Sequence, residues 1–289
     1  MSSARRLIVN ADGYGFGDGA TRGVTDAIEG GFVTSISVNA NFVDIEQLPV
    51  LLDAHPGLSV GVHLNPLVGR PCLPADRVPS LIGADGFFHH HDFRRRLRSG
   101  SIDMNELNSE FDAQVERVRH LAGNKLTHLD SQAHSHLWYF DLFVNLAHRW
   151  RVTRIRTNAS LICLEAPRPR LARAVVYVSK PHVWAAHQYR RWQMRRARYH
   201  GLRSADRLVT VGYGGVGNKT HMDNWLRILR NLPAGTFEIF CHPAYPDETL
   251  RRWSYYQEER SRELNVLRRS ELRKLATELG VQLISFAEI

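Results

Sequence analysis

The amino-acid sequence predicts an α/β protein built as a distorted (β/α) barrel. Short apolar runs of strand length alternate with longer stretches of helical periodicity, which is the pattern of a parallel sheet with crossover helices. Several of the apolar runs end in His, Asp or Asn, and parallel α/β folds build their sites at that end of each strand. A chain of 289 residues suits one barrel of roughly 250 residues with an insertion. We therefore expect a single domain over residues 1–289.

The first half of the chain shows this alternation most regularly. Strands are predicted where β-branched and other apolar residues run together between polar segments, at 7–9, 34–38, 58–64 and 126–130. Helices are predicted where apolar residues recur every three or four positions, at 19–30, 45–54, 105–122 and 138–149. Gly30 and Gly31 end the first of these helices. The proline-rich stretch from 65 to 92 is expected to be a loop.

The second half repeats the alternation around an insertion. Strands are expected at 154–156, 237–242 and 281–286, with a helix over 258–279. Residues 167–207 differ, because arginines are interleaved there with tryptophan and tyrosine. We interpret this segment as a basic, partly helical insertion in the barrel.

The charge of the chain predicts an anionic partner. The formal net charge is +9, and arginines among aromatic residues favour a membrane surface or a lipid-linked or nucleotide-linked sugar. A lid that packs its aromatic rings on the substrate is an alternative role for residues 167–207. Single-stranded nucleic acid is a less favoured partner. The sequence does not decide between a monomer and a homo-oligomer.

Cysteine usage and hydropathy predict a cytoplasmic protein. Cys72, Cys163 and Cys241 are scattered, with neither a disulfide framework nor Cys-x-x-Cys spacing, as expected in a reducing compartment. No apolar run has the length of a signal peptide or a membrane span. Contact with the inner face of a membrane is therefore expected to be peripheral.

Polar residues suited to hydrolysis lie at four predicted strand ends. They are Asn10 and Asp12, His63, Asp130 and His242. A carboxylate can take the proton of an attacking water, and an imidazole can protonate a departing amine. Because the carboxyl ends of parallel strands meet at one edge, we expect these side chains to share a site.

Other residues near these ends suggest further roles. Asp130-x-x-x-His134-x-His136 has ligands that could hold a divalent metal. Arg156, at another strand end, is expected to hold a carboxylate or phosphate of the substrate. The glycine-rich segment 13–19 lacks the dinucleotide-binding pattern, and we expect its backbone N–H groups to stabilise an oxyanion.

Several motifs together resemble the YdjC-like carbohydrate deacetylases, a family that includes chitooligosaccharide deacetylase and hopanoid-associated proteins. The motifs are Leu-Ile-Val-Asn-Ala-Asp at 7–12, Gly-Phe-Val-Thr-Ser at 31–35, Gly-Val-His-Leu at 61–64, Thr-His-Leu-Asp-Ser at 127–131, and Glu238 followed by Cys-His-Pro-Ala-Tyr at 241–245. The resemblance runs from about residue 7 to 286. It implies a NodB-like barrel and metal-dependent removal of an acetyl group from an amino sugar. It also implies His63 as a metal ligand, and Asp12 and His242 as the catalytic base and acid.

The sequence departs from the family pattern at two implied metal ligands. The first family motif reads Asn-Ala-Asp-Asp, and Gly13 stands at its second Asp. The later motif reads Asp-Ser-His-His-His-x-His, and Gln132 stands at its first His. Glycine offers no side-chain ligand and glutamine is a weak, neutral one. Of the three implied ligands, only His63 remains.

Three interpretations stay open. In the first, Asp12, His63 and His134, or His136 as the alternative, hold a divalent metal of the Zn or Mg class. In the second, Asp12, Asp130 and His242 act on a glycosidic bond without metal. In the third, the protein binds a glycan and has lost catalysis. The first predicts deacetylation with Asp12 as base and His242 as acid, and with Asn10, Asp130 and Arg156 contacting the substrate.

Overall fold

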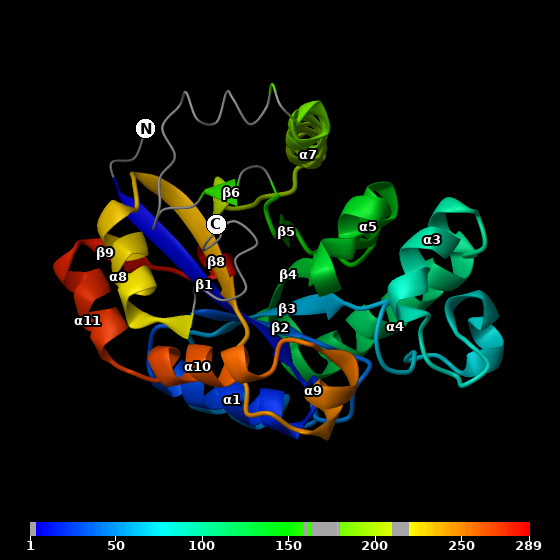
Figure 1. Cartoon of the computed structure of the whole chain (residues 1–289), viewed down its shortest axis with the longest axis horizontal. Helices are drawn as coiled ribbons and strands as arrows, with labels where there is room; N and C mark the ends of the chain where they lie inside the picture. The colour runs from blue at the N-terminus through cyan, green and yellow to red at the C-terminus, as the bar shows by residue number, and fades with distance from the viewer. Residues whose placement is uncertain (1–3, 159–160, 163–177, 179, 210–219) are drawn as a thin grey trace.

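The computed structural model confirms the α/β fold. It describes residues 4–158, 161–162, 178, 180–209 and 220–289, which form one curled sheet of parallel strands with helices packed around it (Figure 1). The strands are β1 (Arg5–Tyr14), β2 (Ser35–Val38), β3 (Ser59–Leu64), β4 (Leu126–Ser131), β5 (Arg154–Ile155), β6 (Leu161–Ile162), β7 (Arg207–Val209), β8 (Gly235–Cys241) and β9 (Val281–Leu283). Their spatial order is β5-β4-β3-β2-β1-β8-β7-β6, and β9 pairs with the beginning of β1.

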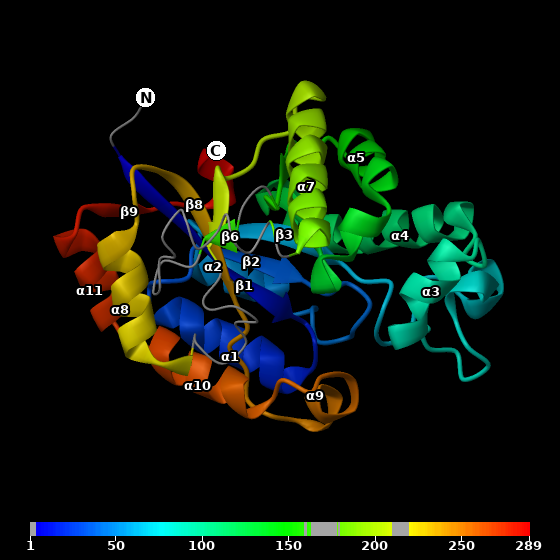
Figure 2. The same ribbon diagram turned by 45° about the horizontal axis from the view of Figure 1, so that its top comes forward.

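Helices alternate with the strands as expected, and three of them, over residues 93–98, 222–231 and 248–253, are not predicted from the sequence. The helices are α1 (Asp18–Glu29), α2 (Leu48–Ala54), α3 (Phe93–Arg98), α4 (Met104–Ala122), α5 (Phe140–Arg149), α7 (Pro181–Tyr199), α8 (Met222–Asn231), α9 (Glu248–Trp253), α10 (Glu258–Leu267) and α11 (Glu271–Glu278). Their apolar faces supply the core, with Val24, Phe111 and Trp225 among its fully buried side chains. α1 lies beside α10, and α4 lies against β3 (Figure 2).

Three predicted boundaries differ from the structure. The first strand continues to Tyr14, so Asn10 and Asp12 lie within a strand and not in a loop after it. The predicted helix over 258–279 is two helices, because the chain leaves the helix between Leu267 and Glu271. Of the insertion at 167–207, the structure describes residue 178 and residues 180–207, in which α7 confirms the expected helical part. Residues 167–177 and 179 lie outside the described residues.

One face of the sheet is polar although it is buried. Side chains alternate between the two faces of a strand, and one face collects Asn10, Asp12, Ser35, Ser37, Ser59, His63, His128, Asp130 and Glu238. Hydrogen bonds join neighbouring strands across this face, as between the hydroxyls of Ser35 and Ser59 (2.7 Å). The sheet therefore places ionisable groups together where water is excluded.

Glycine is required at one point of this face. A Cβ atom on Gly61 would lie 2.3 Å from Nε2 of His128, whose ring stacks on Phe286 at 3.8 Å. The packing of β3 against β4 below the polar cluster thus depends on the missing side chain. No described helix is both long enough and apolar enough to cross a membrane.

Candidate active site

A buried arginine lies at the centre of the polar face. Arg156 directly follows β5, and its backbone N–H donates to the carbonyl oxygen of Leu129 on β4. Its Nη1 contacts Oδ2 of Asp12 (2.7 Å) and Oδ2 of Asp130 (2.8 Å), and its Nη2 contacts Oδ1 of Asp12 (2.7 Å). Its Nε contacts Oε1 of Glu238 at 2.6 Å. The side chain is 1% exposed, so three carboxyl groups from three strands surround it almost without water.

The pKa of each ionisable group in this cluster depends on burial and on the charges of its neighbours. Burial alone would raise the pKa of Asp12 and Asp130, but the neighbouring guanidinium of Arg156 outweighs it and holds both pKa values below their usual range. Burial likewise opposes the charge of Arg156, and the carboxylates outweigh it and raise its pKa. For Glu238, the effect of burial is larger than the opposing effect of Arg156, and the pKa of its carboxyl group rises to about 7. Asp12 and Asp130 are therefore carboxylates at neutral pH, and Glu238 is partly protonated.

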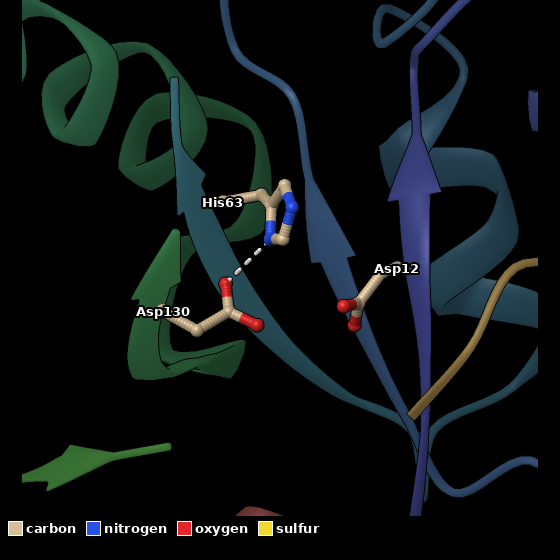
Figure 3. Close-up of side chains that lie close together, drawn as sticks. All are labelled: Asp12, His63 and Asp130. Carbon is tan, nitrogen blue, oxygen red and sulfur yellow. Dashed lines mark hydrogen bonds and ion pairs between the residues drawn. The ribbon is translucent and has the colours of Figure 1, made fainter. Parts of the chain in front are cut away.

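His63 is oriented by Asp130. The two residues are directly paired on β3 and β4, and Nδ1 of His63 lies 2.8 Å from Oδ1 of Asp130. Oδ2 of Asp130 also accepts a hydrogen bond from the hydroxyl of Ser37 at 2.9 Å. Because Asp130 is ionised, it accepts a hydrogen bond from Nδ1 of His63, which leaves Nε2 as the ring nitrogen that Asp130 does not use. Figure 3 shows this second nitrogen turned away from Asp130.

His242 stands at the open side of the cluster. It follows β8, and its Nε2 lies 4.0 Å from Oδ2 of Asp12. Its backbone N–H donates to Oε2 of Glu263 on α10 (2.6 Å), and the hydroxyl of Tyr256 donates to Oε1 of the same carboxylate (2.5 Å). The side chain of His242 is 25% exposed, against 4% for Asp12, 5% for His63 and 0% for Asp130. A substrate therefore meets His242 first, with Asp12 and His63 below it.

The structure gives two expected substrate-binding residues other partners. Arg156 has its guanidinium against Asp12, Asp130 and Glu238, which leaves it in an ion-pair cluster and not open to a substrate anion. Asn10 donates from Nδ2 to Oδ1 of Asp12 (2.6 Å) and to the hydroxyl of Ser37. Both side chains therefore position Asp12, and Asp130, fully buried, positions His63.

His134 and His136 are not in the group whose ligand atoms lie within 4.8 Å of one another, although the charges of Asp130, Arg156 and His63 act on both rings. His136 is buried, with Nδ1 at 2.6 Å from the hydroxyl of Ser131 and Nε2 at 2.5 Å from Nδ2 of Asn158. His134 adopts a left-handed backbone conformation (φ 53°), and burial lowers the pKa of its ring to about 4. Both rings are neutral near pH 7, and both nitrogens of His136 have partners.

The group with the spacing of metal ligands is Asp12, His63 and Asp130, whose ligand atoms lie within 4.8 Å of one another (Figure 3). Hydrogen bonds use most of its lone pairs. Both oxygens of Asp12 accept from Arg156, and the oxygens of Asp130 accept from His63, Ser37 and Arg156. Nε2 of His63 is the ring nitrogen that Asp130 does not use.

A divalent cation at this point would need about three protein ligands free of a competing cation. Nε2 of His63 meets this condition, but the two carboxylates are already bridged by Nη1 of Arg156. Gly13 and Gln132 stand where two further ligands are implied by the family pattern. These residues do not fit a tightly held divalent metal, and the expected metal dependence is not supported by this donor set.

Four N–H groups of the glycine-rich segment are not available as the expected oxyanion donors. The N–H groups of Gly15 and Gly19 donate to the side chains of Thr21 and Asp247. The N–H groups of Phe16 and Gly17 donate to carbonyl oxygens of the same segment. These four donors hold the turn into α1 and are not available to a substrate.

Sequence reasoning gave no role to three residues that the structure places at the site. Glu238 contacts Arg156, Glu263 accepts the backbone N–H of His242, and Nη1 of Arg260 would lie 3.7 Å from a Cβ atom on Gly13. One signal could have identified Glu238, because it is the single acidic residue in the apolar run 237–241. It lies four residues before His242, so both could face the same site. Arg260 and Glu263 lie on α10, which the sequence places far from the strand ends. Nothing in their spacing indicates that the helix packs on the site.

Comparisons with known proteins agree with this architecture. A family model described as YdjC-like protein matches residues 6–278. A carbohydrate deacetylase of Geobacillus stearothermophilus is 32% identical over 98% of both chains, and a chitooligosaccharide deacetylase of Yersinia pestis is 28% identical over 98% of both. A solved Enterococcus faecalis structure, described as a candidate cellobiose-phosphate cleavage protein, is 25% identical over 99% of both chains with a TM-score of 0.76.

Replacing Arg156 with Met should lower the free energy of unfolding by about 3–5 kcal/mol near pH 8, because buried carboxylates lose their counterion. In the unmodified protein, Asp12 and Asp130 have folded pKa values below their unfolded values, so their contribution persists down to about pH 5. In the variant, burial without Arg156 raises these pKa values above the unfolded ones. Its stability should therefore recover as the pH falls.

Urea unfolding of both proteins near pH 8 and pH 5 measures this difference. Arg154→Met is the matched control, because Arg154 donates to main-chain oxygens of Ala287 and Ile289 and pairs with no Asp or Glu side chain in the described residues. The free energy of unfolding should fall less for Arg154→Met than for Arg156→Met, and by the same amount at both pH values. An equal deficit for Arg156→Met at both pH values would contradict the ion-pair account.

Proposed function

The chain belongs to the YdjC-like family, and on that premise we propose that it is a hydrolase that removes an N-acetyl group from an amino sugar or glycoconjugate. The observation that carries the proposal is the convergence of one carboxylate and two imidazoles, Asp12, His63 and His242, at the open end of the polar cluster. Relatives named carbohydrate deacetylase, aligned over nearly the whole chain, support the reaction class.

The proposed reaction begins with a water held between Asp12 and Nε2 of His63. Asp12 accepts a proton from this water as its oxygen bonds to the acetamide carbon, and the carbonyl electron pair moves onto the carbonyl oxygen. The C–N bond then breaks, and protonated His242 gives its proton to the departing amine. The products are acetate and the free amino sugar. Solvent removes the proton from Asp12 and returns one to His242.

Geometry disfavours glycosidic cleavage by paired carboxylates. Asp12 and Asp130 both contact Nη1 of Arg156, and Asp130 is fully buried. A glycosidase needs both carboxyl groups exposed on either side of the scissile bond. Asp12 with His242 fits amide hydrolysis better, because these two groups are the carboxylate and imidazole that face the open side together.

Asp12→Asn should lower kcat/KM for acetate release by about 10²–10⁴-fold, because the amide cannot take the water proton. Acetate release from N-acetylated chitooligosaccharides measures the effect, with reducing-sugar release followed in parallel. Asp18→Asn, a change of the same kind in an exposed surface pair with Arg22, is the control and should keep full activity. Near-normal turnover by Asp12→Asn, or reducing sugar released without acetate, would contradict the proposal.

We further propose that α7 holds the protein at an anionic membrane surface, where the amino sugar is presented on a lipid. α7 contains five arginines and no acidic residue, and Trp184, Tyr189, Trp192 and Tyr199 are exposed on it. Figure 2 shows the helix beside α5, to which Arg196 is tied by an ion pair with Asp141 (2.6 Å). Basic side chains next to exposed aromatic rings suit the interface of an acidic bilayer.

Vesicles rich in phosphatidylglycerol should co-sediment with the protein at low salt and release it at high salt. Arg191→Glu with Arg195→Glu should weaken this binding by at least about tenfold, since each basic residue contributes about 1 kcal/mol. Arg94→Glu with Arg98→Glu on α3 makes the same change in net charge away from α7 and should weaken it less. Equal effects of the two pairs, or preference for single-stranded nucleic acid over the vesicles, would refute a membrane role of α7.

A further inference from the structure

The proposed reaction still needs a group that stabilises the negative oxygen of the transition state. Both carboxylate oxygens of Asp12 already accept hydrogen bonds from Arg156, which makes Asp12 a weak proton acceptor. The donor set does not fit a divalent cation, and four N–H groups of the glycine-rich segment are occupied. Positive charge must therefore come from elsewhere to stabilise the oxygen that becomes negative in the transition state.

We propose that Arg260 is the catalytic residue that binds this oxyanion, so that a fixed guanidinium takes the role of a metal ion in this chain. The inference rests on the proposed deacetylase function and adds a residue to it.

Arg260 is a buried cation with few partners. It lies in the first turn of α10 and is 7% exposed. Its Nε donates to the carbonyl oxygen of Tyr256 at 3.0 Å, and its guanidinium lies 5.7 Å from the centre of the Tyr256 ring. In the described part of the chain, no carboxylate forms an ion pair with it within 4.0 Å. Burial of a guanidinium that no carboxylate contacts directly is costly, although the charges of Glu263, Asp12 and Asp247 act on Arg260 from farther away.

The guanidinium points to the space next to the catalytic carboxylate. A Cβ atom on Gly13, the residue after Asp12, would lie 3.7 Å from Nη1 of Arg260, and its next neighbour would be Phe16 at 4.0 Å. A side chain at this position would begin in ordinary van der Waals contact with Arg260 and Phe16. Because position 13 is glycine, no side chain covers the guanidinium from this position.

The same helix, α10, also positions His242, the proposed catalytic acid. Glu263, one turn after Arg260, accepts the backbone N–H of His242. Burial lowers the pKa of Arg260, and the charges of Glu263 and Asp12 oppose this effect; the group keeps its proton because arginine loses it only far above neutral pH. α10 therefore brings a permanent positive charge to one side of Asp12 and holds the backbone of His242 through Glu263.

In the proposed step, water oxygen bonds to the acetamide carbon and the carbonyl electron pair moves to oxygen. Arg260 donates hydrogen bonds to this oxygen and transfers no proton. When the C–N bond breaks, the electron pair on the oxyanion re-forms the carbonyl of acetate. Charge-assisted hydrogen bonds of this kind strengthen as the negative charge grows, which is the requirement for catalysis.

The kinetic test compares two arginines of α10 in the full-length protein. Arg260→Gln should lower kcat for acetate release from N-acetylated chitooligosaccharides by about 10²–10³-fold with little change in KM. Arg260→Lys keeps the positive charge but loses the planar guanidinium, so its kcat should lie between those of the unmodified enzyme and Arg260→Gln. Arg262→Gln changes an exposed arginine two residues away and should leave kcat unchanged. A kcat for Arg260→Gln within tenfold of the unmodified enzyme would overturn the inference.

A binding test separates this inference from the proposed function. Methylphosphonate carries a methyl group and anionic oxygens in the tetrahedral arrangement of the intermediate. It should raise the unfolding temperature of the unmodified protein and of Arg262→Gln, and not that of Arg260→Gln or Arg260→Lys. Equal stabilisation of the Arg260 variants, or none of the unmodified protein, would refute Arg260 as the anion site. Absence of acetate release would count against the function alone.

Discussion

The ion-pair cluster of Arg156 is the interaction on which the rest of the site depends. One guanidinium contacts carboxyl groups of Asp12, Asp130 and Glu238, which come from β1, β4 and β8. Without it, the curled sheet would enclose like charges away from water, a state that is strongly unfavourable. Arg156 therefore fixes both the distance between these strands and the protonation state of the residues that act. Asn10 and Ser37 complete the arrangement by holding the same carboxylates.

This constraint has a chemical consequence. A carboxylate that is firmly paired is well placed but weakly basic, so catalysis depends on how the negative charge that develops on the substrate is stabilised. In this chain the positions that would extend the ligand set carry Gly13 and Gln132. In the proposed mechanism, two fixed cations supply the positive charge of the site: Arg156, which contacts Asp12, and Arg260, which lies beside Gly13. His63 would accept a hydrogen bond from the attacking water, and His242 would donate a proton to the departing amine.

Much of the fold could be predicted from local sequence, and part of the site could too. Alternating strand and helix patterns gave the parallel sheet, and strand-end positions brought Asp12, His63, Asp130 and His242 to one edge. The pairing of Arg156 could not be predicted, because it joins residues up to 144 positions apart whose side-chain directions depend on register. Arg260 could not be predicted either, since it reaches the site only through the packing of α10. His136 looked like a ligand in the sequence and is instead bonded to Ser131 and Asn158.

If side chains of this protein supply the charge for amide hydrolysis, catalysis needs no bound divalent cation. Metal analysis of the purified protein, combined with acetate release from N-acetylated chitooligosaccharides after prolonged treatment with a strong chelator, measures this independence. We expect far less than one divalent ion per chain and a turnover that neither the chelator nor added Zn²⁺ or Mg²⁺ changes by more than a small factor. One tightly bound ion per chain, with activity lost on chelation and restored by that ion, would contradict it.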